Sequence, residues 1–98
     1  MQPWENPSSA ATGILDDITY DWLPLVWDML FEDNNGGPIC ASEKDILLAK
    51  NLVADHTEIS ASFTGTAGLA GLLAAKRDGC IDSDDSVVIL LTGVDRAF

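Results

Sequence analysis

The sequence predicts an α/β protein, a partial three-layer unit in which helices flank a short, mostly parallel sheet. Three observations carry that prediction. A short alternating run covers residues 58–63, a helix-forming segment rich in small residues follows at 65–76, and a continuous apolar run covers 86–91. Together they read as strand, helix and strand, with a right-handed crossover expected between the strands. The continuous run suits a strand buried on both faces, as in a parallel sheet.

Length, composition and charge limit the classes of protein to which the chain can belong. Its 98 residues make one domain at most, and 47% of them are apolar. Sixteen acidic residues against five basic ones give a net charge of −11, which argues against binding to nucleic acid or to an anionic membrane. No apolar run is long enough to span a membrane, and the N-terminus lacks the pattern of a signal peptide. We therefore expect a cytoplasmic protein.

The first third of the chain predicts a loop and then an apolar helix. Residues 1–13 are rich in Pro, Ser and small side chains, so we expect an extended loop there. Residues 22–31 should form a helix, because Asp21 can cap it and Pro24 falls in its first turn. Nearly every residue of this segment is apolar, including both of its tryptophans. A helix of that kind needs a partner surface on most of its faces.

The middle of the chain predicts a short strand at residues 39–41 and then a helix from about Glu43 to Asp55. Ser42 and Asp45 resemble a capping box, in which Asp45 takes the place of the usual Glu or Gln. Apolar residues recur at helical spacing along one face of this segment, which indicates the side that packs against the rest of the domain.

The helix of the strand–helix–strand unit has a signal at each end. Thr66 occupies the N-cap position, and Gly65 permits a sharp turn before it. Gly79 lies just past a basic last turn, where a C-terminal glycine is expected. Gly68 and Gly71 each cost the helix roughly 1 kcal/mol relative to Ala. That cost indicates close approach of another group, either a neighbouring strand backbone or a ligand at the helix N-terminus.

Side chains with catalytic potential are few. No serine lies in a nucleophile motif, and the chain has neither a GxGxxG sequence nor a GxxxxGK loop. His56 is expected to interact with the end of its helix. The three lysines are expected on wet helix faces, where nothing would lower their pKa for Schiff-base chemistry. They are Lys44, Lys50 and Lys76.

Cysteines and acidic clusters give no metal site. Cys40 and Cys80 form no CxxC motif, and we expect two reduced, partly buried thiols, with a disulfide as the alternative. The acidic turn at residues 82–85 lacks the glycine and the distal glutamate of a calcium loop. We therefore assign no catalytic residue and no metal ligand.

Two motifs together resemble a known family. Residues 64–73, then an acidic turn, then residues 87–93 are similar to the C-terminal end of pyridoxal-phosphate enzymes of the tryptophan-synthase-β fold type. Within that group the chain most resembles threonine synthase and its relatives. Residues 14–22 and the helix start at Ser42 resemble the same portion. The resemblance implies that residues 1–98 are the C-terminal part of a larger catalytic domain.

The resemblance also implies roles for three residues. In the family, a hydroxyl at the end of the last strand hydrogen-bonds the pyridine nitrogen of pyridoxal phosphate, so Thr92 is expected to take that role. Gly65 and Thr66 are expected to lie beside the cofactor ring. A hydroxyl leaves the nitrogen largely unprotonated, which suits β- or γ-elimination and replacement. The pair Thr92-Gly93 favours a threonine-synthase-like member over a serine/threonine dehydratase.

Departures from the family leave two hypotheses. Ser62-Phe63 stands where many relatives carry Glu-Pro, and residues 94–96 follow the family ending only loosely. The Schiff-base lysine and the phosphate loop belong to the upstream part, so the chain alone is expected to be inactive. It would be a fragment or subunit of a lyase acting on amino acids. The alternative is an acidic interaction module that dimerises through its tryptophan-rich helix. The expected partner is accordingly the missing N-terminal portion or a second copy.

Overall fold

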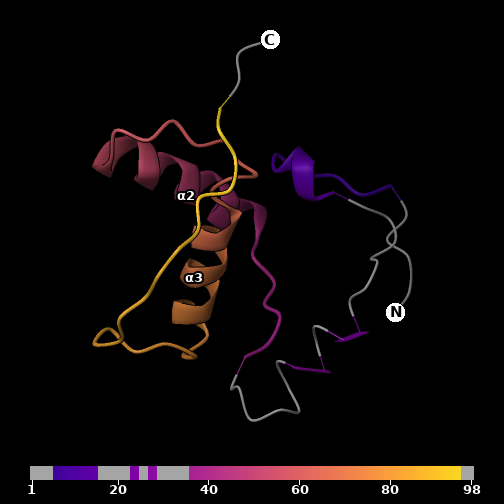
Figure 1. Ribbon diagram of the computed structural model, residues 1–98, viewed down its shortest axis with the longest axis vertical. Helices are drawn as coiled ribbons and strands as arrows, with labels where there is room; N and C mark the ends of the chain where they lie inside the picture. Colours follow the sequence, from indigo (N-terminus) through magenta and orange to yellow (C-terminus); the bar gives the residue numbers. More distant parts are fainter. Residues whose placement is uncertain (1–5, 16–22, 25–26, 29–35, 96–98) are drawn as a thin grey trace.

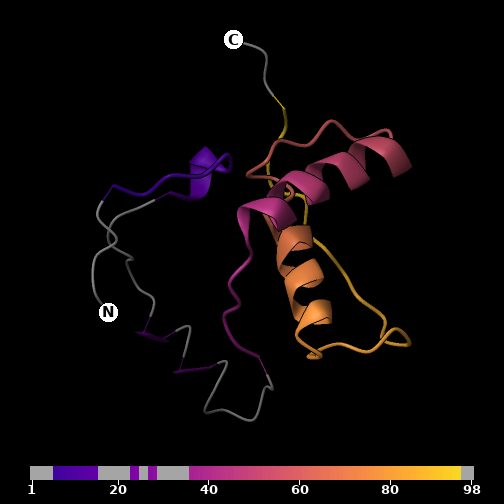
Figure 2. The same ribbon diagram turned by 180° about the vertical axis from the view of Figure 1, so that it is seen from behind.

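The computed structural model describes residues 6–15, 23–24, 27–28 and 36–95. Their elements are, in order, the 3₁₀ helix η1 (Thr12–Ile14), the helix α2 (Glu43–His56) and the helix α3 (Ala67–Arg77). α2 and α3 cross and pack on each other, and the chain after α3 returns alongside it (Figures 1 and 2). Within these ranges no helix is long and apolar enough to span a membrane.

Helix α2 begins where the sequence predicts. The Ser42 hydroxyl accepts a hydrogen bond from the Asp45 N–H at 3.1 Å, and the Asp45 carboxylate accepts one from the Ser42 N–H at 3.0 Å. The predicted capping box is therefore confirmed. The helix ends at His56, one residue beyond the predicted end. There the N–H and hydroxyl of Thr57 both donate to the Val53 carbonyl, which satisfies one of the last free acceptors.

Helix α3 ends in a Schellman motif. Gly79 has a φ of 79°, its N–H donates to the Lys76 carbonyl at 3.2 Å, and the Cys80 N–H donates to the Ala75 carbonyl at 2.9 Å. The predicted C-terminal glycine is thus confirmed. At the other end Thr66 holds the N-cap position, but its hydroxyl makes no bond to the helix backbone.

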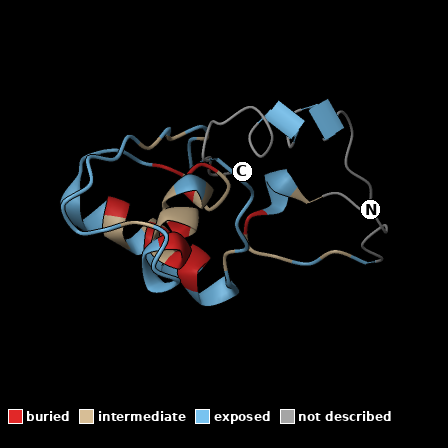
Figure 3. Ribbon diagram, turned by 90° about the horizontal axis from the view of Figure 1, so that it is seen from below, coloured by how far each residue is buried: buried red, intermediate tan, exposed pale blue. Residues whose placement is uncertain are grey.

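The core is built from small side chains where α2 and α3 cross. Figure 3 shows buried residues on both helices and on short stretches of the chain beside them. Ala49 of α2 and Ala70 of α3 have no exposed surface, and Ile46 is 7% exposed. Small residues at a crossing let two helix backbones approach closely, and the larger side chains then pack around the crossing. Those larger neighbours are Phe63, Leu69 and Leu73.

The chain on either side of α3 is joined by one isolated bridge. Ala61 and Val94 face each other in antiparallel orientation. The bridge is closed by the Ser62 N–H, which donates to the Gly93 carbonyl at 3.1 Å, and by one further bond from residue 95 to residue 60. The sequence predicts mostly parallel pairing, and this contact is antiparallel.

The described residues contain no strand. The segments predicted as strands at 39–41 and 86–91 make no backbone hydrogen bond to another described segment, and 58–63 contributes only the bridge at Ala61. A strand exists through its neighbour in a sheet, so a lone extended segment is not assigned as one. The short parallel sheet of the α/β fold therefore stays a prediction.

The N-terminal segment is fastened to the beginning of α2. The Ser9 hydroxyl and the Ala10 N–H donate to the Glu43 carboxylate at 2.5 and 2.7 Å. These hydrogen bonds hold the pKa of Glu43 below its ordinary value. The bond from the Ser9 hydroxyl has the larger effect, and the bond from the Ala10 N–H has the second largest. Further along, the Gly13 N–H donates to the Thr64 hydroxyl at 2.8 Å. Residues 6–11 are irregular, as expected for a loop, and η1 follows them.

The predicted apolar helix at residues 22–31 is described only in part. Leu23, Pro24, Trp27 and Asp28 are helical, and the other residues of that segment lie outside the described ranges. The side chains of Leu23 and Trp27 are each 55% exposed.

Candidate functional site: a groove beside helix α3

An apolar groove of about 750 Å³ runs along α3. One wall is α3 between Ala67 and Ala75, and a second is the returning segment at residues 87–92. Ile39 and Ile46 contribute from the beginning of α2 and the chain before it. Thr64 and Thr92 are the only lining residues with a polar side chain in the described part of the protein. The groove is therefore apolar with two hydroxyl groups, a composition that suits a small ligand held by a few polar contacts.

Thr92 is placed at the groove by a backbone contact. Its N–H donates to the Gly65 carbonyl at 3.3 Å, so the end of the returning segment lies against the turn that leads into α3. Thr92 is exposed, and its hydroxyl makes no hydrogen bond to any described residue. That hydroxyl is thus available to a ligand in the groove.

Two glycines make this contact possible. A Cβ atom added to Gly65 would lie 2.1 Å from the Gly93 carbonyl oxygen and 2.7 Å from the Gly93 nitrogen. Those distances are far inside van der Waals contact, and the atoms concerned belong to the backbone. The turn before α3 and the returning segment can meet because Gly65 lacks a side chain. A Cβ at Gly93 would be less severe, 2.8 Å from the Ser62 hydroxyl oxygen and 3.3 Å from the Gly65 nitrogen.

The two glycines inside α3 have more room. A Cβ at Gly68 would be 3.6 Å from the Leu90 carbonyl oxygen, and one at Gly71 would be 3.4 Å from the Ile39 side chain. Both are ordinary contacts, so close backbone packing does not account for these glycines. Gly68 is exposed and lines the groove. Of the two explanations that the sequence leaves open, the ligand remains consistent with this geometry.

Thr66 lies beneath the turn. It has no exposed surface, and its hydroxyl donates to the Ser62 carbonyl at 3.0 Å. The Ser62 hydroxyl in turn accepts the Gly65 N–H at 2.9 Å. These bonds hold the turn in shape. Of the three predicted cofactor residues, only Thr92 lines the groove. Gly65, which Thr92 contacts through its backbone, and Thr66 are both buried, and contact of all three with a cofactor stays a prediction.

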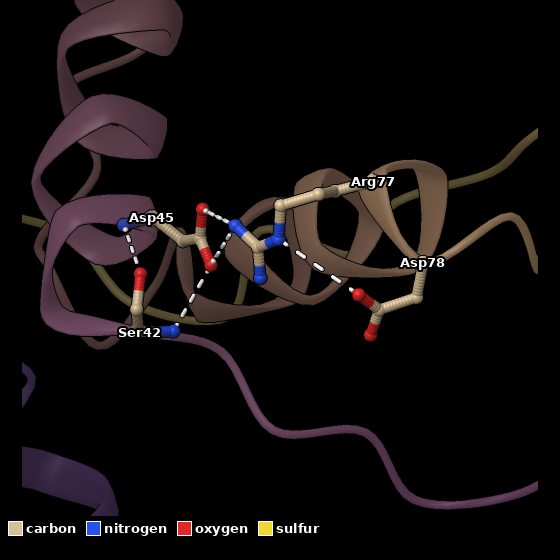
Figure 4. Close-up of polar contacts among 4 residues, drawn as sticks. All are labelled: Ser42, Asp45, Arg77 and Asp78. Carbon is tan, nitrogen blue, oxygen red and sulfur yellow. Dashed lines mark hydrogen bonds and ion pairs between the residues drawn. The ribbon is translucent and has the colours of Figure 1, made fainter.

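A charged pair joins the first turn of α2 to the last turn of α3. Arg77 Nη1 donates to Asp45 Oδ1 at 2.9 Å and to Oδ2 at 3.1 Å (Figure 4). Asp45 is 6% exposed, while the Arg77 side chain is 55% exposed. The Arg77 guanidinium, with the Ser42 N–H as the second cause, lowers the pKa of Asp45 to about 2. Sequence reasoning found Asp45 as a capping residue but missed this partner, 32 residues away, because no local pattern signals such a pair.

The lysines lie away from the groove. Lys50 Nζ is 3.0 Å from Asp95 Oδ2 and 4.9 Å from the centre of the Phe63 ring, so it ties the end of the described chain to α2. Lys50 is half-buried, so the prediction that it lies on a solvent-exposed helix face is wrong. Lys44 and Lys76 are exposed, as predicted. None of the three is among the residues that line the groove.

The two cysteines are free, as expected, but the prediction that they are partly buried is wrong. Cys40 and Cys80 are both exposed, because each lies in the irregular chain outside the helices. In the described residues, no three His, Cys, Asp or Glu side chains come together as a metal site would require.

Comparison with known proteins gives a partial relationship. No protein-family model matches the chain, and no solved structure matches it. Its similar proteins include the threonine synthases of Mycobacterium bovis (strain ATCC BAA-935 / AF2122/97) and Mycobacterium tuberculosis (strain ATCC 25618 / H37Rv). Each is 30% identical over 92 residues, which cover 94% of this chain and 25% of the relative. The chain therefore spans about a quarter of the length of these relatives and is threonine-synthase-like over that quarter.

Proposed function

We propose that this chain is the C-terminal fragment or subunit of a threonine-synthase-like, pyridoxal-phosphate-dependent lyase that acts on amino acids in the cytoplasm. One observation carries the proposal: the unpaired hydroxyl of Thr92 stands at the wall of an apolar groove, one backbone hydrogen bond from Gly65. These are two of the three residues for which the family resemblance implies contact with the cofactor. The identity with threonine synthases runs through the same part of the chain.

The groove fits the ring of the cofactor and not its phosphate. Apolar walls suit an aromatic ring, and the Thr92 hydroxyl can hydrogen-bond the pyridine nitrogen without giving it a full proton. Pyridoxal phosphate, when bound, supplies an acceptor for the negative charge that develops on the amino acid during elimination or replacement. No basic side chain lines the groove in the described residues. The groups that hold the phosphate, and the lysine that holds the cofactor, would come from the polypeptide that corresponds to the rest of the enzyme.

Reconstitution from two polypeptides tests this function. The 98-residue chain is expressed together with the part of the Mycobacterium tuberculosis threonine synthase that it does not match. The pair is expected to co-purify, to bind pyridoxal phosphate and to form threonine. Thr92→Val keeps the shape of the side chain and removes the hydroxyl, so the rate should fall at least tenfold, which corresponds to the roughly 1.4 kcal/mol or more of a hydrogen bond to a polar ligand atom.

Thr92→Ser is the matched control, because it retains the hydroxyl and should retain most of the rate. Equal activity of the Val and Ser variants would show that Thr92 does not contact the ring nitrogen. A pair that neither co-purifies nor binds the cofactor would reject the proposed function itself.

One observation favours a second candidate, the acidic module that dimerises through its tryptophan-rich helix. Leu23 and Trp27 lie one helical turn apart, and each exposes 55% of its surface. Sedimentation of the isolated chain distinguishes the candidates. A stable dimer whose formation is abolished by Trp27→Ala would favour the module, whereas a monomer that associates with the enzyme segment would favour the lyase.

A further inference from the structure

The groove contains a second hydroxyl group besides that of Thr92. Thr64 lines the groove and is half-buried, and its carbonyl accepts the Ala67 N–H at 3.2 Å, which ties it to the beginning of α3. The Thr64 hydroxyl oxygen accepts the Gly13 N–H at 2.8 Å. A hydroxyl group can accept two hydrogen bonds and donate one. Among the described residues nothing accepts the Thr64 hydrogen, so this donor is available to a ligand.

The Gly13 N–H belongs to a short segment that is fastened at both ends. This segment, the strap, comprises residues 9–14. Its first two residues donate to the Glu43 carboxylate at the beginning of α2, and Gly13, near its other end, donates to Thr64. Ile14, the last residue of the strap, lines the groove. The strap therefore reaches from α2 to the turn before α3 and forms part of the groove wall.

The contact between the strap and Thr64 is close. A Cβ atom added to Gly13 would lie 2.8 Å from Thr64 Cγ2 and 2.9 Å from Thr64 Oγ1, so a larger residue at this position would displace the Thr64 side chain. Threonine is branched at Cβ, which restricts the rotation of its side chain. Ala11 has no exposed surface and anchors the middle of the strap in the core. The strap thus engages one lone pair of the Thr64 hydroxyl and leaves its hydrogen to point elsewhere.

The two hydroxyl groups of the groove lie in neighbouring parts of the structure. Thr64 immediately precedes Gly65, whose carbonyl accepts the Thr92 N–H. A mostly apolar cavity orients its ligand through a few polar groups of this kind. We infer that the Thr64 hydroxyl donates a hydrogen bond to a second acceptor atom of the bound pyridoxal phosphate, other than the ring nitrogen, and that the strap orients it for this contact. The inference rests on the proposed function and adds a residue to its site.

The strap and the cofactor then stabilise each other. One hydroxyl group accepts from Gly13 and donates to the ligand, and hydrogen bonds in such a chain strengthen one another by polarisation. Because Ile14 lines the groove, a ligand there also adds apolar contact to the strap. Coupling between two binding equilibria is reciprocal. A change that loosens the strap should therefore weaken cofactor binding, and bound cofactor should hold the strap more tightly.

Cofactor affinity tests the contact at Thr64. The apparent dissociation constant for pyridoxal phosphate is measured by fluorescence for the full 98-residue chain, assembled with the part of the Mycobacterium tuberculosis threonine synthase that it does not match. Thr64→Val keeps the shape of the side chain and removes the hydroxyl group, so the constant should rise about tenfold. Thr64→Ser is the matched control, because it retains the hydroxyl group, and its constant should stay within about twofold of the original value.

Two further measurements test the strap. Glu43→Ala removes its anchor on α2 and leaves both groove hydroxyl groups in place, so the dissociation constant should rise about threefold. Glu58→Ala is the charge-matched control and should leave binding unchanged, because Glu58 is exposed and lies outside the strap and the groove. Hydrogen–deuterium exchange of the Gly13 amide, followed by NMR, should slow at least about threefold when the cofactor binds. Thr64→Val should abolish that protection.

Each other outcome has a distinct meaning. Equal affinity of the Thr64→Val and Thr64→Ser variants would overturn the contact and leave the proposed function standing, because the cofactor still binds. A loss of affinity in Thr64→Val, with no effect of Glu43→Ala and no protection of the Gly13 amide, would overturn the role of the strap. An assembly that binds no pyridoxal phosphate would overturn the proposed function and this inference with it.

Discussion

At the scale of single residues, Asp45 links the two helices through its side chain. One carboxylate closes the capping box of α2 and binds Arg77 at the end of α3. The pKa of Asp45 falls from 3.8 to about 2 because the ionised form is favoured. A lowered pKa in the folded state means that the stabilisation is fully present above pH 3.8 and is lost as the pH falls through about 2.

The variant Asp45→Asn tests this directly. Asn can still accept the Ser42 N–H, so the change removes the charge and keeps the cap. We expect the variant to be less stable than the original protein at pH 6, and the difference to shrink steadily between pH 4 and pH 2, as measured by urea unfolding. Asp78→Asn is the control, since Asp78 is 3.8 Å from Arg77 Nε and exposed. A difference that does not change with pH would show that the ion pair is not its source.

Gly65 supports a second prediction at this scale. Gly65→Ala forces a methyl group against the backbone of Gly93, so we expect a loss of about 1–3 kcal/mol or more in unfolding free energy. Gly68→Ala is the matched control. Its Cβ has room beside Leu90, and Ala favours a helix over Gly by about 1 kcal/mol, so this variant should be more stable. If both variants behaved alike in urea unfolding, the close contact at Gly65 would be wrong.

The sequence predicted single residues well where their partners are near in the chain. Ser42 with Asp45, and Gly79 after a basic turn, are local patterns that depend on a few backbone angles. It could not predict that Arg77 binds Asp45 or that Gly65 meets Gly93, since both depend on how distant segments pack. Gly65 was singled out for its turn and, through the family resemblance, for a place beside the cofactor ring, but not for this contact.

At the scale of elements, the last turn of α3 depends on Gly79. Its φ of 79° lies in the left-handed region, where a side chain is strained. Gly79→Ala should lower the unfolding free energy by about 1 kcal/mol, and Gly79→Asn should cost less because Asn tolerates this conformation. Circular dichroism during urea unfolding measures both. No atom lies within 4 Å of the added Cβ, so equal stability of Ala and Gly here would contradict the Schellman geometry.

The helices and the sheet differ in how far the sequence could predict them. α2 and α3 satisfy their hydrogen bonds internally, and their boundaries agree with the prediction to within a residue or two. The segments at 39–41 and 86–91 have strand-like patterns but no paired neighbour among the described residues. A strand pattern predicts which side chains share a face of the strand, but it does not predict which segment pairs with that strand. The sheet therefore stays a prediction, because its evidence lies in pairing that the described residues do not contain.

At the scale of the whole molecule, the excess of acidic residues governs stability. Sixteen acidic against five basic side chains repel one another in the compact state. Raising NaCl from low to physiological concentration screens that repulsion, so we expect the unfolding temperature to rise by about 4–8 °C, equivalent to about 1 kcal/mol. An unfolding temperature that falls with salt would show instead that the ion pairs of Asp45 and Asp95 outweigh the repulsion.

The two exposed thiols provide reporters of assembly that need no mutation. Cys40 follows Ile39 and Cys80 precedes Ile81, and both isoleucines line the groove. These are the only cysteines in the 98 residues, so a polarity-sensitive maleimide dye would label two positions bordering the same cleft. A polypeptide that covers the groove should shift the emission of such a dye to the blue. The same titration would follow assembly in real time, at protein concentrations too low for sedimentation.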